Sequence, residues 1–275
     1  MYFDHVPHSI FIKPLNTFDN WPENPNYPNE AVHRTRQINT YDDWKIVPAS
    51  RPLVNPPMFR ENYVDLPGLY GSLDYSRAHM GLPIYGNRTG QWEFIVLNDF
   101  RPWEEAYSTI QHTIHGKRCF VVLEDDPDYY YVGNLKLNDW RSDPGWSRIV
   151  IEYNLLPFKY HRDKTKLKLT ISGTEAKSIK VASNLIGEAP VFPWIKISPP
   201  NTSDPVKNVV SLTNDEIRNT QRITITKGSV YVPAPDLILS NESGQNEVSM
   251  TFYGSGITEA TGPVSIEVLY TRRYM

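Results

Sequence analysis

The chain has 275 residues, among them 23 prolines, 15 glycines and 17 tyrosines, and its formal net charge is −3. This length accommodates two domains of common size, and the charge excludes an overall basic field that would attract nucleic acid. Abundant aromatic, proline and glycine residues favour short strands joined by tight turns. No N-terminal leader pattern and no apolar run of the ~20 residues that cross a bilayer is found, so we expect folding in a reducing cytosol without membrane insertion.

The first predicted strand is the apolar run at residues 9–15, which Pro14 confines to a sheet edge or a strand end. Beyond it, the pattern Asn-Thr-aromatic-Asp-x-Trp occurs at residues 16–21 and again at 39–44. Two short copies do not make a solenoid, which needs several stacked units. The proline-rich segment between them predicts an inserted surface loop at about residues 20–40.

Residues 46–57 are rich in proline, so this piece is predicted to run extended with few backbone donors. It leads into residues 64–96, the stretch around which the chain is organised. Here Pro67-Gly68 and Gly86-Asn87 have the composition of tight turns. The sequence therefore predicts an extended hairpin between two turns, followed by a longer strand.

The strand at residues 90–96 has one apolar face, because Trp92, Phe94 and Val96 alternate with polar residues. That period of two is typical of a half-buried strand. No nucleophile, general base or ligand cluster stands out in this stretch. The composition of the region thus favours an assembly or binding protein over an enzyme.

The one convincing helix is predicted to begin near Pro102. Glu104 and Glu105 suit the positive end of a helix dipole, and Gly116 is a natural C-terminal stop. Apolar residues recur at steps of three and four and form one face of this helix: Trp103, Ala106, Tyr107, Ile110 and Ile114. We expect that face to pack on a sheet.

Three further strands are predicted at residues 118–123, 129–137 and 147–153. The connections between them are too short for a parallel crossover, so the strands are expected to pair antiparallel. Cys119, the only cysteine, lies in the first of them. A single cysteine in an apolar run predicts a buried thiol.

A polar stretch around residues 157–166 predicts the boundary between an N-terminal domain, residues 1–160, and a C-terminal domain, residues 161–275. Beyond this boundary the pattern is entirely strand and turn, ending in an alternating segment at 264–270. Many short strands at this spacing are typical of a β-sandwich or jelly roll. The predicted fold class is mainly β, with a sandwich-like N-terminal domain that carries the helix and the hairpin.

Three places invite a chemical interpretation. The acidic run at residues 124–128 could hold Ca²⁺ or supply paired carboxylates, but its spacing favours a hairpin turn. His112 and His115 stand three apart on the helix, yet nothing completes a metal set, so a structural role is favoured. Trp194 could stack on a sugar ring, although Trp is as common in sandwich cores. No catalytic residue, metal or cofactor is expected.

Several motifs of the first 158 residues stand in one order along the chain: DDWKIVPASRP at 42–52, NPP at 55–57, VDLPG at 64–68, GSLD at 71–74, YGNR at 85–88, LEDDP at 123–127 and YYY at 129–131. Together they resemble the distal tail protein of long-tailed, non-contractile bacteriophages. The second half is similar, more loosely, to the galectin-like C-terminal domain of that family.

This resemblance implies a structural protein of the virion, located at the tail tip and assembled in the cytoplasm of a bacterial host. It implies a ring of six copies that surrounds the DNA channel without reading DNA sequence. It further implies that the tail-tube protein stacks on one face of the ring and the tail-tip protein on the other. Receptor-binding or baseplate proteins are expected on the flank.

Closing such a ring requires one patch of each subunit to meet a different patch on its neighbour. The residues that we expect at this subunit contact are Asp65, Asp74, Tyr85, Asn87 and Arg88. Arg88 offers a fork for a carboxylate of the neighbour. An internal salt bridge of Arg88 is the alternative interpretation.

Two other classes of function stay open on the sequence. A carbohydrate-binding β-sandwich for host attachment would be a monomer whose second half binds a glycan, with Trp194 stacking on the sugar. A glycosidase would use Glu124 or Asp126 as its carboxylates.

Overall fold

The computed structural model of the chain describes residues 8–15, 37–68, 70–77, 83–96, 102–143, 146–171, 177–182, 187–198, 209–214, 219–224, 231–234, 239, 247–255 and 264–275. The first copy of the Asn-Thr-aromatic-Asp-x-Trp pattern and most of the predicted loop at about 20–40 lie outside these residues. Two compact units are present, one with the described residues up to Lys159 and the other running from Tyr160 to Tyr274.

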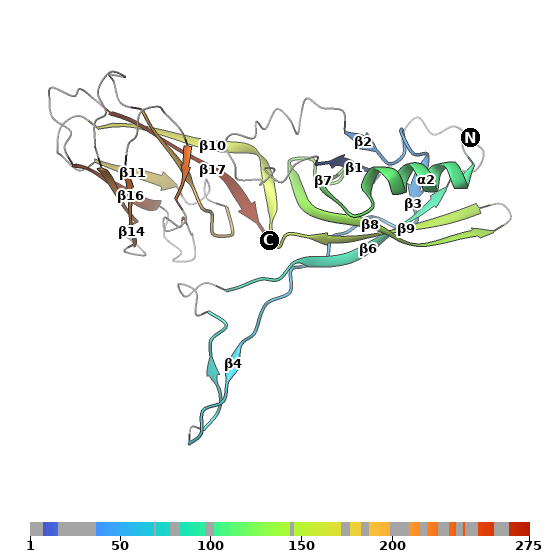
Figure 1. Ribbon diagram of the computed structural model, residues 1–275, viewed down its shortest axis with the longest axis horizontal. Coiled ribbons are helices and arrows are strands. Elements are labelled where there is room, and N and C mark those ends of the chain that lie inside the picture. The colour runs from blue at the N-terminus through green and yellow to red at the C-terminus, as the bar shows by residue number, and fades with distance from the viewer. Residues whose placement is uncertain are drawn as a thin grey trace. The chain divides into compact units, whose positions relative to one another are not determined.

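The first unit is built on one curled antiparallel sheet (Figure 1). Its strands follow the order β3 (Ile46–Pro48), β6 (Arg88–Val96), β9 (Trp146–Leu155), β8 (Tyr129–Asp143), β7 (Lys117–Leu123), β1 (Ile10–Pro14) and β2 (Ile38–Asn39). Short turns join β7 to β8 and β8 to β9, which explains the antiparallel pairing. The N-terminal unit therefore has a single curled sheet where the sequence suggested a sandwich-like arrangement.

Helix α2 (Trp103–Ile114) covers one side of this sheet, against β7 and β8 (Figure 1). Pro102 precedes the helix, and its carbonyl accepts the first helical hydrogen bond from Ala106. Gly116 follows with φ of 70°, the left-handed conformation that ends many helices. The predicted start and stop of the helix are confirmed.

The core of the first unit lies between the helix and the sheet. Trp92, Phe94 and Val96 on β6 are at most 4% exposed, which confirms the predicted alternation. Cys119 is fully buried in the same core, and burial raises the pKa of its thiol to about 12. The thiol is therefore inert at neutral pH, as a buried core cysteine should be.

A register shift interrupts the β8–β9 pairing between Leu137 and Trp140. Leu137 lies opposite Ile151 and Trp140 lies opposite Ile149, so β8 has one more residue than β9 in this interval. Such a β-bulge changes which face of the strand a side chain occupies. The bulge places Trp140 on the helix side of the sheet, where its ring stacks on that of Trp103.

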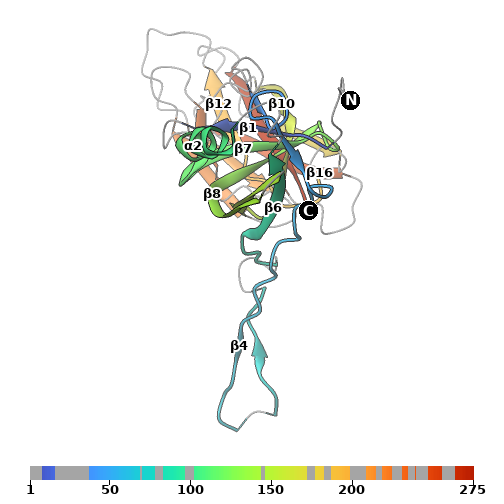
Figure 2. The ribbon, with the colours of Figure 1, turned by 90° about the vertical axis from the view of Figure 1, so that its right-hand side faces the viewer.

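A long hairpin leaves the first unit between β3 and β6, and we call residues 56–86 the arm. It contains β4 (Tyr63–Val64) and β5 (Leu73–Asp74), which pair only with each other among the described residues. Both views of the ribbon show the arm leading away from the curled sheet (Figures 1 and 2). The extended hairpin is thus present and Pro67-Gly68 forms a turn as predicted, whereas Gly86-Asn87 is no turn and leads directly into β6.

The second unit is made of strands in two sheets. One has the order β15 (Tyr231–Pro233), β12 (Trp194–Ser198), β17 (Val264–Tyr274) and β10 (Lys159–Ile171). The other has the order β11 (Lys177–Ala182), β16 (Glu247–Ser255), β13 (Val209–Asn214) and β14 (Asn219–Thr224). Side chains of β11, β12 and β17 share one core, so the two sheets enclose it as in a sandwich.

Candidate functional site

The arm exposes an unusual amount of apolar surface. Eight of the twelve exposed large hydrophobic side chains among the described residues belong to it: Met58, Phe59, Tyr63, Val64, Leu66, Tyr70, Tyr75 and Ile84. Many exposed apolar side chains on one element are typical of a place where another molecule binds. A two-stranded hairpin is also only marginally stable by itself in water. A binding partner would therefore stabilise the arm.

Local hydrogen bonds shape the distal end of the arm. Gly68 and Gly71 both have φ of 86°, which a side chain would strain, and they flank the exposed ring of Tyr70. The Ser72 hydroxyl donates to the Asp65 carboxylate, and the Ser76 amide donates to Asp74 over 2.8 Å. Hydrogen bonds from Ser76 lower the pKa of Asp74. These carboxylates therefore fix the turns of the arm in the isolated chain.

The segment at residues 49–55, which we call the root, bonds to β6 through the backbone at Ala49 and from Leu53 onward is held to the sheet through side chains. The Trp92 indole donates to the Leu53 carbonyl over 2.9 Å. The Asn55 amide donates to the Tyr153 hydroxyl over 3.0 Å, and the Asn55 side chain donates to the Thr89 carbonyl over 2.8 Å. Pro52 has no backbone donor, and beyond it side chains of the sheet bond the backbone of Leu53 and Asn55.

Arg88 fastens the root from the first position of β6. Its Nε donates to the Pro157 carbonyl over 2.7 Å, and one terminal nitrogen donates to the Asn55 carbonyl over 3.0 Å. The residue is only 4% exposed, and its guanidinium lies 5.7 Å from the centre of the Tyr131 ring. Burial lowers the pKa of Arg88. In the isolated chain Arg88 therefore bonds internally, to carbonyls, and not through an exposed fork or a salt bridge.

A second cluster holds the other end of the root. The Arg51 Nε and the His8 Nδ1 both lie 2.8 Å from the Asp125 carboxylate. Asp125 belongs to the acidic turn between β7 and β8, whose predicted hairpin geometry is confirmed. In the same turn, Glu124 accepts the Ser9 amide, and Asp126 pairs with Lys159 over 2.8 Å. The acidic residues thus tie the root and the strand ends together.

The five predicted contact residues all belong to the arm or to the place where it rejoins the sheet. Asp65 and Asp74 are exposed on the distal arm. Tyr85 packs between Phe59 and Phe158, Asn87 donates to the Asn154 side chain over 2.8 Å, and Arg88 is buried as described. Their role in a subunit contact stays a prediction. Sequence reasoning missed the exposed apolar side chains of the arm, for which alternation gave no signal.

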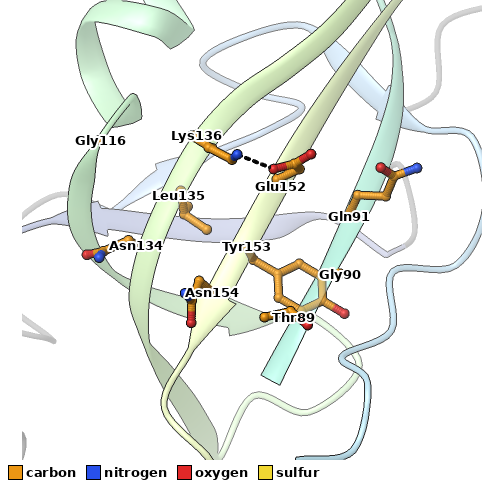
Figure 3. A pocket seen from close by; sticks show the side chains of 10 residues that line it. All are labelled: Thr89, Gly90, Gln91, Gly116, Asn134, Leu135, Lys136, Glu152, Tyr153 and Asn154. Atoms are coloured by element: carbon orange, nitrogen blue, oxygen red, sulfur yellow. Dashed lines mark ion pairs between the residues drawn. The ribbon is translucent and has the colours of Figure 1, made fainter. Parts of the chain in front are cut away.

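A hollow of about 720 Å³ lies over β6, β9 and β8 (Figure 3), and we call it the polar hollow because most residues that line it are of polar type. Gln91, Glu152 and Lys136 stand side by side across these strands, and Lys136 pairs with Glu152 over 2.6 Å. The only carboxylate of the hollow is therefore neutralised by a lysine. Glycoside hydrolysis needs two carboxylates that face each other, and this hollow does not supply them.

The remaining candidates have structural partners. His115 accepts the Leu137 amide through Nδ1 over 3.2 Å. In the described part of the chain no group of three His, Cys, Asp or Glu residues could hold a metal ion. Trp194 is half-buried and lies across from Pro233 and Leu269, and a role in sugar stacking stays a prediction. Within the same described part, no helix is long and apolar enough to span a bilayer.

The fold of this chain, with its curled sheet, one helix, arm and second β unit, is similar to that of a solved phage tail protein. The crystal structure of the Dit protein of phage SPP1, described as a paradigm of the hub adsorption apparatus in phages that infect Gram-positive bacteria, matches this chain with a TM-score of 0.54. The match covers 84% of this chain and 92% of SPP1 Dit at 12% sequence identity.

Sequence comparisons add nothing to this match. No family model matches the chain, and no curated protein matches it either. At 12% identity the likeness to SPP1 Dit establishes a shared fold. The resemblance noted in the sequence motifs is therefore supported at the level of the fold.

Proposed function

We propose that this chain is a structural subunit of a phage tail tip and that it assembles through its arm into a closed ring of six copies. The observation that carries the proposal is the arm itself. Eight of its large apolar side chains are exposed, and its root is fixed to the sheet by five hydrogen bonds from or to side chains. A rigidly rooted apolar arm is suited to reach a neighbouring subunit.

A ring also fits the chemistry of the rest of the first unit. Closed rings need a heterologous contact, in which a projecting element of one copy meets a different surface on the next. Neither the polar hollow nor the acidic turn offers a catalytic arrangement, which favours a structural role. The likeness of the fold to a protein described as a tail hub supports the same conclusion.

The finer parts of the proposal follow from the resemblance in the sequence motifs. The ring would surround the DNA channel, with the tail-tube protein on one face and the tail-tip protein on the other. The second unit would be a galectin-like sandwich that offers its flank to receptor-binding or baseplate proteins. Assembly would take place in the cytoplasm of the bacterial host.

Mass measured by light scattering on a size-exclusion column tests the ring. We expect the wild-type chain to form one species near six times its mass of 31.7 kDa. A variant with Tyr63→Ser, Tyr70→Ser and Tyr75→Ser should remain monomeric and keep its thermal unfolding temperature, because all three rings are exposed. A wild-type monomer at every concentration contradicts the ring, and a ring formed by the triple variant contradicts the role of the arm.

A further inference from the structure

Outside the arm, exposed large apolar side chains are rare in the described residues. Apart from Leu53 in the root and Met275 at the chain end, they are Trp140, 48% exposed, and Trp146, 43% exposed. Both lie near the end of the β8–β9 hairpin, and the register places them on opposite faces of it. Among the described residues, these two faces are therefore the candidates for a surface that receives an apolar arm.

The face with Trp140 offers an aromatic patch, which we define as Trp103, Tyr107 and Trp140. The Trp140 ring stacks on Trp103 with centroids 4.7 Å apart and planes at 19°. Tyr107 meets both rings, at 6.1 Å from Trp103 and 6.2 Å from Trp140. Helix α2 and the bulged strand thus hold three rings together at a surface that is half open to solvent.

The face with Trp146 is different in character. It continues into paired charges, with Arg148 Nε 2.8 Å from Glu93 and Lys136 2.6 Å from Glu152, and into the amides of the polar hollow. Covering that face with apolar side chains would remove these charges and amides from water without new partners, which is unfavourable. The three rings of the aromatic patch carry no charge and no ion pair.

We propose that the arm of one copy packs against the aromatic patch of the next copy in the ring. This inference rests on the proposed function and specifies its contact. The arm contributes rings and aliphatic groups, and the patch contributes the stacked rings of Trp103 and Trp140, so apolar surface meets apolar surface on two different parts of the chain. Such a contact is heterologous, as a closed ring requires.

Cysteine crosslinking between two differently marked chains tests the contact. One chain carries Tyr70→Cys at the end of the arm, and the other carries Gln111→Cys, one helical turn beyond Tyr107 and exposed. Native Cys119 is buried, so a short bis-maleimide crosslinker should join only the introduced thiols. We expect a crosslinked dimer from this mixture. The matched control replaces Gln111→Cys with Asn134→Cys in the polar hollow, and we expect little product from it.

Two tryptophan variants measure how much each side chain contributes to assembly. Trp140→Ala should raise the protein concentration needed for half-assembly by about tenfold or more, as loss of a central aromatic anchor does. Trp146→Ala is the matched control and should leave that concentration within about twofold. Both side chains are partly exposed, and equal thermal unfolding temperatures would show that folding is intact.

The outcomes separate this contact from the ring itself. Wild-type rings with product only from the Asn134→Cys mixture, or from neither mixture, overturn the contact and leave the ring standing. A larger assembly defect in Trp146→Ala than in Trp140→Ala also overturns it. A wild-type chain that stays monomeric overturns the ring and, with it, the contact.

Discussion

Arg88 illustrates how one buried side chain can fix a whole segment. Its guanidinium holds two carbonyls that come from opposite directions along the chain, Asn55 and Pro157. A planar fork with several donors suits this task, whereas a lysine ammonium is a single point on a flexible stem. The internal role also explains why a residue found in a run of turn signals is almost fully buried.

Replacing Arg88 with lysine should therefore destabilise the first unit. We expect Arg88→Lys to lower the free energy of unfolding by about 1–3 kcal/mol, because one of the two partly buried carbonyls loses its donor. Chemical denaturation measures the change. Arg141→Lys on the exposed part of β8 is the matched control and should change stability by less than about 0.5 kcal/mol. Equal effects of the two substitutions would contradict the anchoring role.

Asp125 gives the cluster at the root a dependence on pH. Partial burial opposes ionisation, yet hydrogen bonds and charges from His8 and Arg51 prevail and lower the pKa of this carboxyl. Because the folded pKa lies below the unfolded value of about 3.9, the stabilisation is complete above that pH and is lost as pH falls through the folded pKa. Acid should therefore loosen the root.

The matching experiment is thermal unfolding between about pH 2 and pH 6. We expect Asp125→Asn to lower the unfolding temperature above about pH 4 and to lose part of the fall that the wild-type chain shows below it. Asp128→Asn, in the same turn, is the control. If Asp125→Asn and the wild type lose stability in parallel as the pH falls, the cluster contributes nothing.

At the scale of elements, β6 packs closely against the root at Gly90, where no side chain separates them. A Cβ at Gly90 would lie 2.3 Å from the Tyr153 hydroxyl and 2.7 Å from the Asn55 side-chain nitrogen. Both groups hold the root, so any side chain at this position displaces it. The glycine is needed here for close approach and not for a special φ.

Gly90→Ala should therefore destabilise the first unit and also loosen the attachment of the arm. We expect a loss of about 1–3 kcal/mol in the free energy of unfolding, the usual penalty for an overpacked site. Cleavage of the arm by chymotrypsin in the unassembled chain should also become faster, since the root is displaced. Thr89→Ala at the exposed neighbouring position is the control. An unchanged unfolding curve for Gly90→Ala would show that the Tyr153 contact is dispensable.

Regular elements were predictable because their signals are local. The alternation of β6 and the three-and-four spacing of α2 determine which side chains face the core, and neighbouring turns determine the pairing. The root was not predictable in the same way. Its bonds join Trp92 to Leu53, Asn55 to Tyr153 and Arg88 to Pro157, partners 39 to 98 residues apart, and no local pattern encodes such pairs. The bulge that brings Trp140 to Trp103 is equally non-local.

For the whole molecule, an apolar contact implies a particular response to salt. Screening weakens contacts between exposed charges, and at 1 M ionic strength the Debye length is about 3 Å. Apolar contacts are not weakened in this way. We therefore expect the mass of the assembled species to be the same in about 0.05 M and 1 M sodium chloride. Dissociation at high salt would indicate an ionic contact, such as a lysine or arginine of the neighbour at the exposed carboxylates of Asp65 or Asp74.

The exposed arm also limits how long a free subunit can persist in a cell. Before assembly, its rings are open to chaperones, to proteases and to the arms of misplaced copies, which are the usual fates of uncovered apolar surface. Expression above the rate of ring closure should therefore yield aggregates, and slower synthesis should yield more assembled protein. The arm thus couples the yield of correctly assembled subunits to the timing of their synthesis.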